Sequence, residues 1–580
     1  MTKYHVLGIR TAPDFDSLPA AMVDPVEKAS SPPVTRQDHV FPVLTTTQLV
    51  RLAAPGRARA VAAGETLADA GERTARFFVI TAGRLEVVLA SGGVEHVVAV
   101  LGRGQFTGEM SVLAGRRGLA RIRMVEAGEV VEVDRPHLLA LVQADSELSD
   151  ILMRAFILRR VDIIAQGLGN VVLVGSSHSP DTLRVNEFLT RNGHPHTYLD
   201  LDRDPGVQEM LDRFHVQVAE IPVLICRGET VLRNPTNKAI ADCLGLNAPV
   251  DEAQVHDVVI VGAGPAGLAA AVYGASEGLD VIVLEATAPG GQAGSSSKIE
   301  NYLGFPTGIS GQELAGRAYT QAQKFGAQMV IARVARKLRC ERRPYVIEAD
   351  DGTALMARAV VIATGAAYRK LAVEHGVRFE GAGIYYGATP MEAQLCRSQE
   401  AIVVGGGNSA GQAAVFLAQT CRRVVMLVRG PGLAESMSRY LIRRIDRDAV
   451  IELRTQTEIV GLEGDGQLER VRWRDHRAGG VEVRDVRHVF VMTGAEPSTR
   501  WLDGCVALDA KGFIKTGPDL SREDLAAGRW PLARAPFLLE TSLPGVFAVG
   551  DVRGGNMKRV ASAVGEGSTA IAFVHRVLNG

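Results

Sequence analysis

The sequence predicts a multidomain α/β protein, with an N-terminal β jelly-roll, a central α/β unit and a C-terminal half that carries two dinucleotide-binding units. The chain has 580 residues, more than one hydrophobic core normally covers. Short apolar strands between turn residues follow the N-terminal segment. From about residue 256, strand, glycine turn and helix alternate to the end, which is typical of parallel α/β folds.

Composition restricts the classes of partner and site. The chain has 64 Lys and Arg residues against 65 Asp and Glu residues, so no net field would attract nucleic acid or an anionic membrane. Six cysteines stand apart without a CxxC pair or metal-ligand spacing, so we expect neither a disulfide scaffold nor a metal site. The start of the chain has no apolar signal-peptide core, and a reducing cytoplasm fits this composition.

The N-terminal half divides into segments where the spacing of apolar and turn residues changes. Residues 1–40 show no periodicity and are expected to be irregular. Residues 41–165 begin with a short helix over 45–54, continue with strands near 77–83, 84–90 and 96–101, and end in a helical run, which predicts the jelly-roll. Residues 166–250 follow the order βαβαββα, with strands near 170–177, 196–202, 221–226 and 229–234 and helices near 183–193 and 206–216.

The first glycine-rich unit spans Asp257 to Glu285. Its glycines, Gly262, Gly264 and Gly267, give the spacing GxGxxG between an apolar strand and an Ala-rich helix. These positions allow a tight turn, close approach of a pyrophosphate and close packing of helix on strand. Glu285 ends the next strand, where a carboxylate can bind a ribose diol. The uncharged stretch Val258 to Ser276 is therefore better explained as strand, turn and helix than as a membrane span.

A second unit, from Glu400 to Arg429, repeats this pattern with Gly405, Gly407 and Ala410. The residue that closes its second strand is Arg429 instead of an acid. A guanidinium there suits a 2′-phosphate, which favours NADPH over NADH without excluding NADH. The alternative is that Arg429 is a solvated cation at a strand end.

Five segments then resemble the low-molecular-weight thioredoxin reductases in order and interval: GGQ at 290–292, ENYLGFP at 300–306, ATGA at 363–366, GGGNSA at 405–410 and GVFAVGD at 545–551. The resemblance covers about residues 256–580. It implies a homodimeric flavoprotein with an FAD domain in two parts, 256–370 and 491–580, and an NAD(P)H domain at 371–490 between them.

The resemblance also implies which residues hold the two cofactors. The positions that would contact FAD are Gly262, Gly264, Pro265, Ala266, Gly267, Glu285, Gly291, Gln292, Asn301, Thr364, Gly365, Gly550 and Asp551, with Arg559, Val560 and Ala561 beside the isoalloxazine. Those that would contact NADPH are Gly405, Gly407, Asn408, Ser409, Ala410 and Arg429.

The redox dithiol of that family is missing from this sequence. Its two cysteine positions fall on Gly387 and Pro390, and the acid that follows falls on Met391. Neither glycine nor proline can attack a disulfide, so no catalytic side chain is assigned. The nearest sulfur is that of Cys396, which is either a redox-active thiol or, as we favour, a small core residue. Glu392 lies next to the lost acid position.

The two preceding units resemble other families. Residues 166–248 are similar to glutaredoxin and thioredoxin domains, but the C-P-x-C positions fall on Ser179, Pro180, Asp181 and Thr182, and Pro222 is a candidate for a cis peptide bond. Residues 40–160 resemble bacterial cyclic-nucleotide-binding domains. Gly108 and Glu109 would contact the nucleotide, yet the phosphate-binding arginine position reads Gly118, and Arg116 and Arg117 come earlier.

The sequence thus favours an FAD-dependent NAD(P)H oxidoreductase, whose electron acceptor is unidentified and whose N-terminal unit regulates it. Oxygen, a quinone and a redox protein are all open as acceptors. Two alternatives stay open: a thioredoxin-disulfide reductase that uses dithiols of another chain, and a low-turnover sensor that binds nucleotides. Cyclic nucleotide binding is itself open, because the ion pair to the phosphate is lost.

Overall fold

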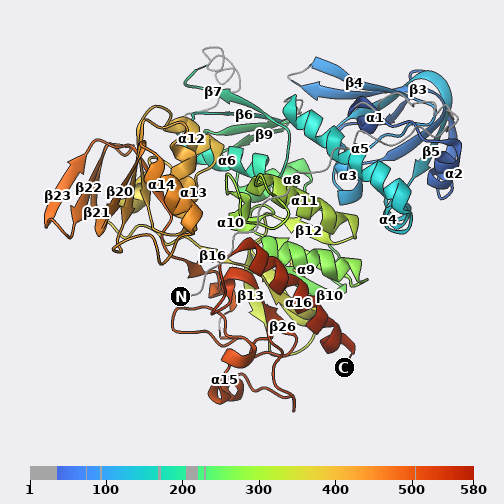
Figure 1. Cartoon of the computed structure of the whole chain (residues 1–580). Coiled ribbons are helices and arrows are strands. Elements are labelled where there is room, and N and C mark those ends of the chain that lie inside the picture. The colour runs from blue at the N-terminus through green and yellow to red at the C-terminus, as the bar shows by residue number, and fades with distance from the viewer. Residues whose placement is uncertain are drawn as a thin grey trace, which may run out of the picture.

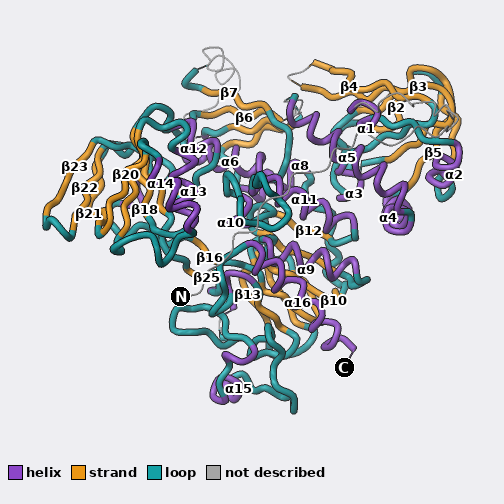
Figure 2. The backbone as a smooth tube through the Cα atoms, in the orientation of Figure 1, coloured by secondary structure: helices purple, strands orange, loops and turns teal. Residues whose placement is uncertain are grey.

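The computed structural model describes residues 36–73, 75–91, 94–166, 171–203, 220–227, 230–502 and 504–579 (Figure 1). The helix expected at 206–216 and most of the expected extension at 1–40 lie outside these ranges. Figure 2 shows the strands gathered into separate sheets, with helices packed beside them.

The N-terminal unit is a five-stranded antiparallel sheet with helices on one side. The strands are β1 (Arg57–Val61), β2 (Thr66–Ala68), β3 (Phe77–Ser91), β4 (Val94–Gly102) and β5 (Arg121–Val133), in the order β1-β5-β3-β4 with β2 against β5. The helices are α1 (Arg36–Val40), α2 (Thr46–Ala53), α3 (Met110–Ala114), α4 (Arg135–Ala144) and α5 (Ser146–Ala165). Residues 36–40 are therefore helical, which corrects the expectation of an irregular segment there. Two strands predicted separately are joined in β3, whose pairing with β5 continues across the junction through register shifts between Ile80 and Leu85.

The central unit has a four-stranded sheet in the order β7-β6-β8-β9. Its elements are β6 (Val171–Gly175), α6 (Pro180–Arg191), β7 (Thr197–Asp200), β8 (Val223–Cys226), β9 (Thr230–Arg233) and α8 (Asn237–Leu244). Strands β6 and β7 are parallel, and the other pairs are antiparallel. The Ile221–Pro222 bond is cis, as predicted.

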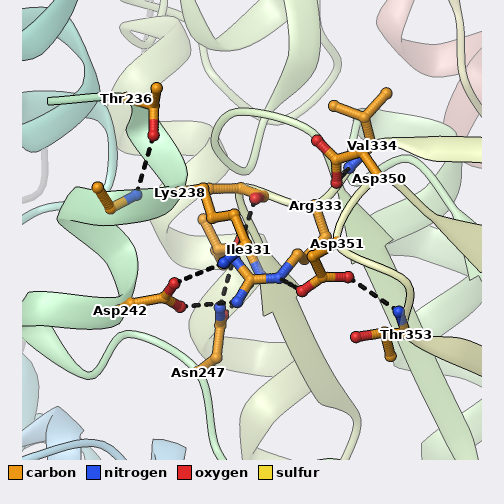
Figure 3. A network of polar contacts seen from close by, with 12 residues as sticks. Thr236, Lys238, Asp242, Asn247, Ile331, Arg333, Val334, Asp350, Asp351 and Thr353 are labelled. Carbon is orange, nitrogen blue, oxygen red and sulfur yellow. Dashed lines mark hydrogen bonds and ion pairs between the residues drawn. The ribbon is translucent and has the colours of Figure 1, made fainter.

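A polar network attaches the central unit to the C-terminal half (Figure 3). Arg333 donates from Nη2 to Asp242 Oδ1 on α8 at 2.7 Å and from Nε to Asp351. Asn247 exchanges two hydrogen bonds with the backbone of Ile331, at 2.7 and 2.9 Å. The Arg333 side chain is nearly buried, and Asp351 of the same half fixes its guanidinium. The half-exposed Asp242 and the Asn247 hydrogen bonds then join the central unit to the C-terminal half.

The larger C-terminal sheet has seven strands in the order β12-β11-β10-β15-β14-β13, with β26 beside β15. Parallel pairing joins β10 (Val255–Val261), β11 (Val281–Glu285), β12 (Gln328–Ile331), β15 (Ala354–Ile362) and β26 (Val546–Ala548), while β13 (Ala335–Arg339) and β14 (Tyr345–Ala349) are antiparallel. Helices α9 (Pro265–Ser276), α10 (Gly291–Gly294), α11 (Gly311–Lys324) and α16 (Val560–Asn579) cover it. The uncharged stretch Val258 to Ser276 forms most of β10, a turn and α9, as predicted.

A second parallel sheet is inserted between β15 and β26. Its order is β17-β24-β18-β19-β20, formed by β17 (Ile384–Tyr385), β18 (Glu400–Val404), β19 (Arg423–Val428), β20 (Ile451–Thr455) and β24 (His488–Val491). Helices α12 (Pro390–Leu395), α13 (Asn408–Leu417) and α14 (Arg439–Arg447) pack on it, and β21 (Thr457–Glu463), β22 (Arg470–Asp475) and β23 (Gly480–Arg484) form an antiparallel sheet. The chain enters and leaves this insert through a two-stranded ribbon, β16 (Ala366–Ala367) with β25 (Glu496–Pro497).

The spacing of the cysteines in the sequence suggests no disulfide bond, but the structure contains one. Cys340 and Cys505, 165 residues apart, form a disulfide bond. The other four cysteines carry free thiols. Among the helices in the described ranges, none combines the length and the apolarity that crossing a bilayer requires.

Candidate functional site

The first glycine unit adopts the close backbone contacts that its spacing predicts. Gly262 has a φ of +103°, and a Cβ there would lie 2.4 Å from the carbonyl oxygen of Ala363. A Cβ on Gly267 would lie 1.9 Å from Gly262 O, so only glycine lets α9 start this close to β10. Gly264 caps α9 without a side chain, whereas Ser179 and Ser310 accept backbone hydrogen bonds at the starts of α6 and α11. The first-turn amides of α9 are thus available to an anion.

Glu285 lies at the carboxyl end of β11 with both oxygens oriented by the backbone. Oε2 accepts from Ala263 N at 2.7 Å, and Oε1 accepts from Thr287 N at 2.9 Å and from Ala288 N at 3.2 Å. The residue is buried. A carboxylate with remaining lone pairs is therefore fixed beside the first glycine turn, where it can accept from hydroxyl groups.

The second glycine unit repeats this geometry. Gly405 has a φ of +138°, and a Cβ there would lie 2.6 Å from Met492 O. Gly407 caps α13 without a side chain, and a Cβ on it would meet only open space. Asn408 Oδ1 accepts from Ser438 N at 2.7 Å, which fixes the first residue of α13.

One cavity of about 580 Å³ joins the two units. Most of the residues predicted to bind cofactors line it: Gly262, Gly264, Pro265, Ala266, Glu285, Gly291, Gln292, Asn301, Thr364, Gly365, Asn408, Ser409, Gly550, Asp551, Arg559 and Val560. Burial raises the pKa of Asp551, and Gly550 N donates to Glu566 Oε2 at 2.7 Å. The cavity lies in the size range of small-molecule sites.

Six predicted residues do not line this cavity: Gly267, Gly405, Gly407, Ala410, Arg429 and Ala561. Gly267, Gly405 and Ala410 lie inside the turns, where their smallness sets the packing. Ala561 is exposed in the first turn of α16. Arg429 is exposed just after β19, and its guanidinium makes no hydrogen bond or ion pair to any residue that the structure describes.

Residues 256–567, more than half of the chain, match the model of the pyridine nucleotide-disulphide oxidoreductases. The chain belongs to this family. The thioredoxin reductase of Mycolicibacterium smegmatis is 35% identical over 324 residues, which cover 56% of the chain and 97% of that protein. This pyridine nucleotide-disulphide oxidoreductase is thus an NAD(P)H-dependent flavoprotein oxidoreductase, of a family that uses FAD and NADPH.

Solved structures agree with this assignment. The thioredoxin reductase of Lactococcus lactis is 26% identical, with a TM-score of 0.50, and covers 56% of the chain and 99% of its own length. That of T. acidophilum is 29% identical, with a TM-score of 0.50 and the same coverage. Residues 58–145 of this pyridine nucleotide-disulphide oxidoreductase match a second model, the cyclic nucleotide-binding domain.

No cysteine is among the described residues that line the cavity. Cys396, just after α12, is fully buried in the core of the inserted unit. Its Sγ donates to Glu392 O at 3.3 Å and accepts from Cys421 Sγ at 3.3 Å. The hydrogen bond with Cys421, together with burial, raises the pKa of Cys396. The geometry is that of the packed core residue favoured from sequence.

Glu392 has a local structural partner. Its Oε2 accepts from Thr389 N at 2.9 Å and from Thr389 Oγ1, at the start of α12. Burial raises the pKa of this carboxyl group. Glu392 therefore orders the helix start, and it is absent from the cavity lining.

Sequence reasoning missed part of the cavity wall. Glu187 and Arg191, at the end of α6 in the central unit, line it together with Tyr368, Tyr386 and Lys558. Arg191 donates from Nη2 to Gly291 O at 2.9 Å, next to the GGQ segment. The one available signal was the pair of charges at spacing i, i+4, which alone indicates only a helix surface.

Proposed function

We propose that this chain passes electrons from NADPH through bound FAD to an acceptor outside the chain, without a cysteine pair of its own. The observation that carries the proposal is the cavity itself. It places the start of α9 and the start of α13 on one shared cavity, and no cysteine of the described chain lines that cavity.

The residues present fit the two cofactors. The uncapped amides of α9 suit the FAD pyrophosphate, and Glu285 suits a ribose diol. Asp551, Gln292, Asn301, Arg559 and Val560 line the rest of the cavity and would hold the remainder of FAD. Asn408 and Ser409 begin α13, and with Arg429 beyond β19 they would hold NADPH.

Bound FAD supplies the hydride-accepting chemistry, which needs no nucleophile from the protein. The protein's part is to orient and to exclude water. The carboxylate of Glu285 is fixed by three backbone donors, and the glycine turns let both helix starts approach the cavity closely.

Anaerobic titration with NADPH tests the first half of the proposal, since the oxidised flavin band should bleach at about one equivalent. A second titration uses a Cys396→Ala, Cys421→Ala double variant, which should bleach equally. Steady-state assays with oxygen, a quinone and thioredoxin plus a disulfide dye then identify the acceptor class. Flavin that stays oxidised would refute the proposal, and turnover with thioredoxin that needs Cys396 would favour a disulfide reductase.

We further propose that the N-terminal unit regulates the flavin domain. Helix α3 packs against α11, and Arg116 reaches Tyr319 on α11 through its Nη2 and through ring stacking at 5.3 Å. A Cβ on Gly290 would lie 2.4 Å from Ala315 Cβ of α11, so movement of α11 presses on the GGQ segment. Tyr319→Phe should change the dissociation constant of FAD, measured by flavin fluorescence. An unchanged constant would contradict this coupling.

We also propose that the central unit is a thioredoxin-like domain without redox activity. In β6, α6 and the cis-Pro222 loop it has the elements of that fold, and Ser179 caps α6 by accepting from Thr182 N at 3.4 Å where a cysteine would stand. Its role in this proposal is structural, because α6 supplies Glu187 and Arg191 to the cavity wall.

A further inference from the structure

The N-terminal unit encloses a second cavity, of about 230 Å³, between its sheet and the carboxyl end of α5. Strands β3, β4 and β5 and the loop before β5 provide its apolar wall, which includes Val87, Leu89, Ala99, Leu101, Leu119 and Ile122. Gly108 and Glu109, the residues expected to contact a cyclic nucleotide, also line it. The cavity therefore occupies the position in which the matched domain family binds its ligand.

The two arginines nearest the phosphate-binding position point elsewhere. Arg116 is buried against Tyr319, and Arg117 donates from Nη1 to Gly71 O at 3.0 Å. The Arg117 side chain also lies against Gly245, where a Cβ would be 2.4 Å from its Cγ. Neither arginine lines the cavity, so neither offers a guanidinium to a phosphate there.

The two guanidinium groups that do line the cavity, those of Arg76 and Arg159, are engaged by the protein at every nitrogen but one. Arg76 donates from Nε and Nη2 to the two carboxylate oxygens of Glu132, at 2.8 and 2.7 Å, and from Nη1 to a carbonyl oxygen. Arg159 donates to Val40 O and Gly108 O, both at 2.8 Å, and its guanidinium lies between two phenylalanine rings. The buried Nη2 of Arg159 has no partner among the described residues, so it could offer a single donor. A phosphate that took two parallel donors from one guanidinium would have to break these contacts.

Acidic side chains outnumber these two cations in the wall. Asp69, Glu72, Glu109 and Asp162 all line the cavity. Glu109 is not free for a ribose hydroxyl in the expected way, because Oε1 accepts from Ser111 N at 3.0 Å and Oε2 pairs with Arg160 Nη1 at 3.3 Å. Three of these carboxylates, Asp69, Glu109 and Asp162, are paired with arginines, so their negative charge is largely compensated. What does not fit a cyclic phosphate is the absence of a guanidinium with two unengaged donors among the described lining residues.

We propose that this cavity binds an uncharged, largely apolar small molecule instead of a cyclic nucleotide. The apolar wall provides the driving force, since burying apolar ligand surface is favourable in proportion to its area. The volume exceeds the roughly 150 Å³ that accommodates benzene in an engineered apolar cavity, so a compound of one or two rings fits. The inference does not depend on which acceptor the flavin domain uses.

The binding experiment uses the full-length protein and the uncharged fluorophore N-phenyl-1-naphthylamine. We expect a saturable rise in its fluorescence, and calorimetry with cyclic AMP and cyclic GMP should show no binding heat at saturating concentration. Tight binding of either cyclic nucleotide would overturn the proposal.

Matched variants locate the binding site. Ala99 lines the cavity from β4, and Val97, two residues earlier on the same strand, is 54% exposed and outside the lining. Ala99→Phe fills the cavity and should weaken the fluorophore's binding about tenfold, while Val97→Phe should leave it unchanged. Leu119→Asp, in the loop, places a charge in the wall without added bulk and should weaken binding similarly.

Far-UV circular dichroism and the thermal melt of each variant serve as the folding control, because Ala99 and Leu119 lie in the N-terminal unit itself. If the fluorophore bound Ala99→Phe and Leu119→Asp as tightly as it bound Val97→Phe, the ligand would lie elsewhere and the proposal would be wrong. A fluorescence rise that did not saturate with the unmodified protein would also refute the proposal.

Discussion

The Sγ atom of Cys396 lies 3.3 Å from the Sγ atom of Cys421, inside the core of the inserted unit. The two residues are 25 positions apart and come from the segments after α12 and after α13. Both side chains are buried, and neither touches the cavity between the glycine units. The thiol nearest in sequence to the lost dithiol is therefore held in the core by a second thiol.

Replacing Cys396 with alanine should leave NADPH-driven turnover within about twofold of the unmodified protein, because its thiol does not line the cavity. The change removes a buried sulfur, so the free energy of unfolding should fall by about 1 kcal/mol. Stopped-flow flavin reduction and thermal melts measure the two effects. Loss of turnover with flavin content intact would show that this sulfur carries electrons.

Glu285→Gln should weaken FAD binding about tenfold, because glutamine has one acceptor oxygen for three backbone donors. The flavin retained after gel filtration and the FAD dissociation constant report the effect. Glu252→Gln, on the exposed turn before β10, is the matched control and should change neither quantity. Equal flavin loss in both variants would contradict the role of Glu285.

Arg429→Ala should raise the KM for NADPH about tenfold and leave the KM for NADH unchanged, because only NADPH carries the 2′-phosphate. Arg422 stands at the other end of the same strand and is also exposed, so Arg422→Ala is the control. Steady-state kinetics with both coenzymes decide the point. A parallel rise for NADPH and NADH would mean that Arg429 does not recognise the phosphate.

Acid should destabilise the inserted unit through His488. Burial lowers the pKa of His488 to about 4, from 6.5, so the folded state keeps the ring neutral while the unfolded state protonates it. The contribution of neutral His488 to the free energy of unfolding is fully present above pH 6.5 and is lost as the pH falls toward 4. At pH 5 the loss is about 2 kcal/mol. His488→Phe should reduce the difference in Tm between pH 7 and pH 5. The exposed control, His96→Phe, should show the same pH sensitivity as the unmodified protein.

Gly118→Arg restores a guanidinium where the cyclic-nucleotide-binding pattern expects one. The backbone tolerates it, because a Cβ there would meet its nearest atoms at 3.8 Å and φ is not left-handed. We expect cyclic AMP binding to appear and fluorophore binding to weaken about tenfold. Isothermal calorimetry measures both. Absence of cyclic AMP binding would show that the acidic wall, and not the missing cation, is decisive.

The positions at which the local backbone conformation requires glycine could be predicted from the sequence. Gly262 and Gly405 mark the turns correctly because a left-handed φ and a carbonyl within contact distance exclude side chains. Glu285 at a strand end followed from the same local pattern. These features depend on residues within one strand, turn and helix, and so on short-range geometry.

Contacts between units could not be predicted in this way. Arg191 reaches Gly291 O, 100 residues away, and Arg116 reaches Tyr319. The disulfide joins Cys340 to Cys505, and no spacing pattern in the sequence predicts it. Such pairs depend on how separately folded units pack, and a single charged or sulfur-bearing residue carries no signal of its partner.

Helix α6 contacts the units of both parallel sheets, one at each of its ends. At one end Pro180 packs on Gly381, so closely that a Cβ there would lie 2.6 Å from Pro180 Cβ, and at the other end Arg191 is tied to Gly291. The ribbon of β16 and β25 joins the units that contain these two sheets. A rotation of one unit relative to the other about that ribbon would have to break the α6 contact at one end, so the central unit would limit how far the two can rotate.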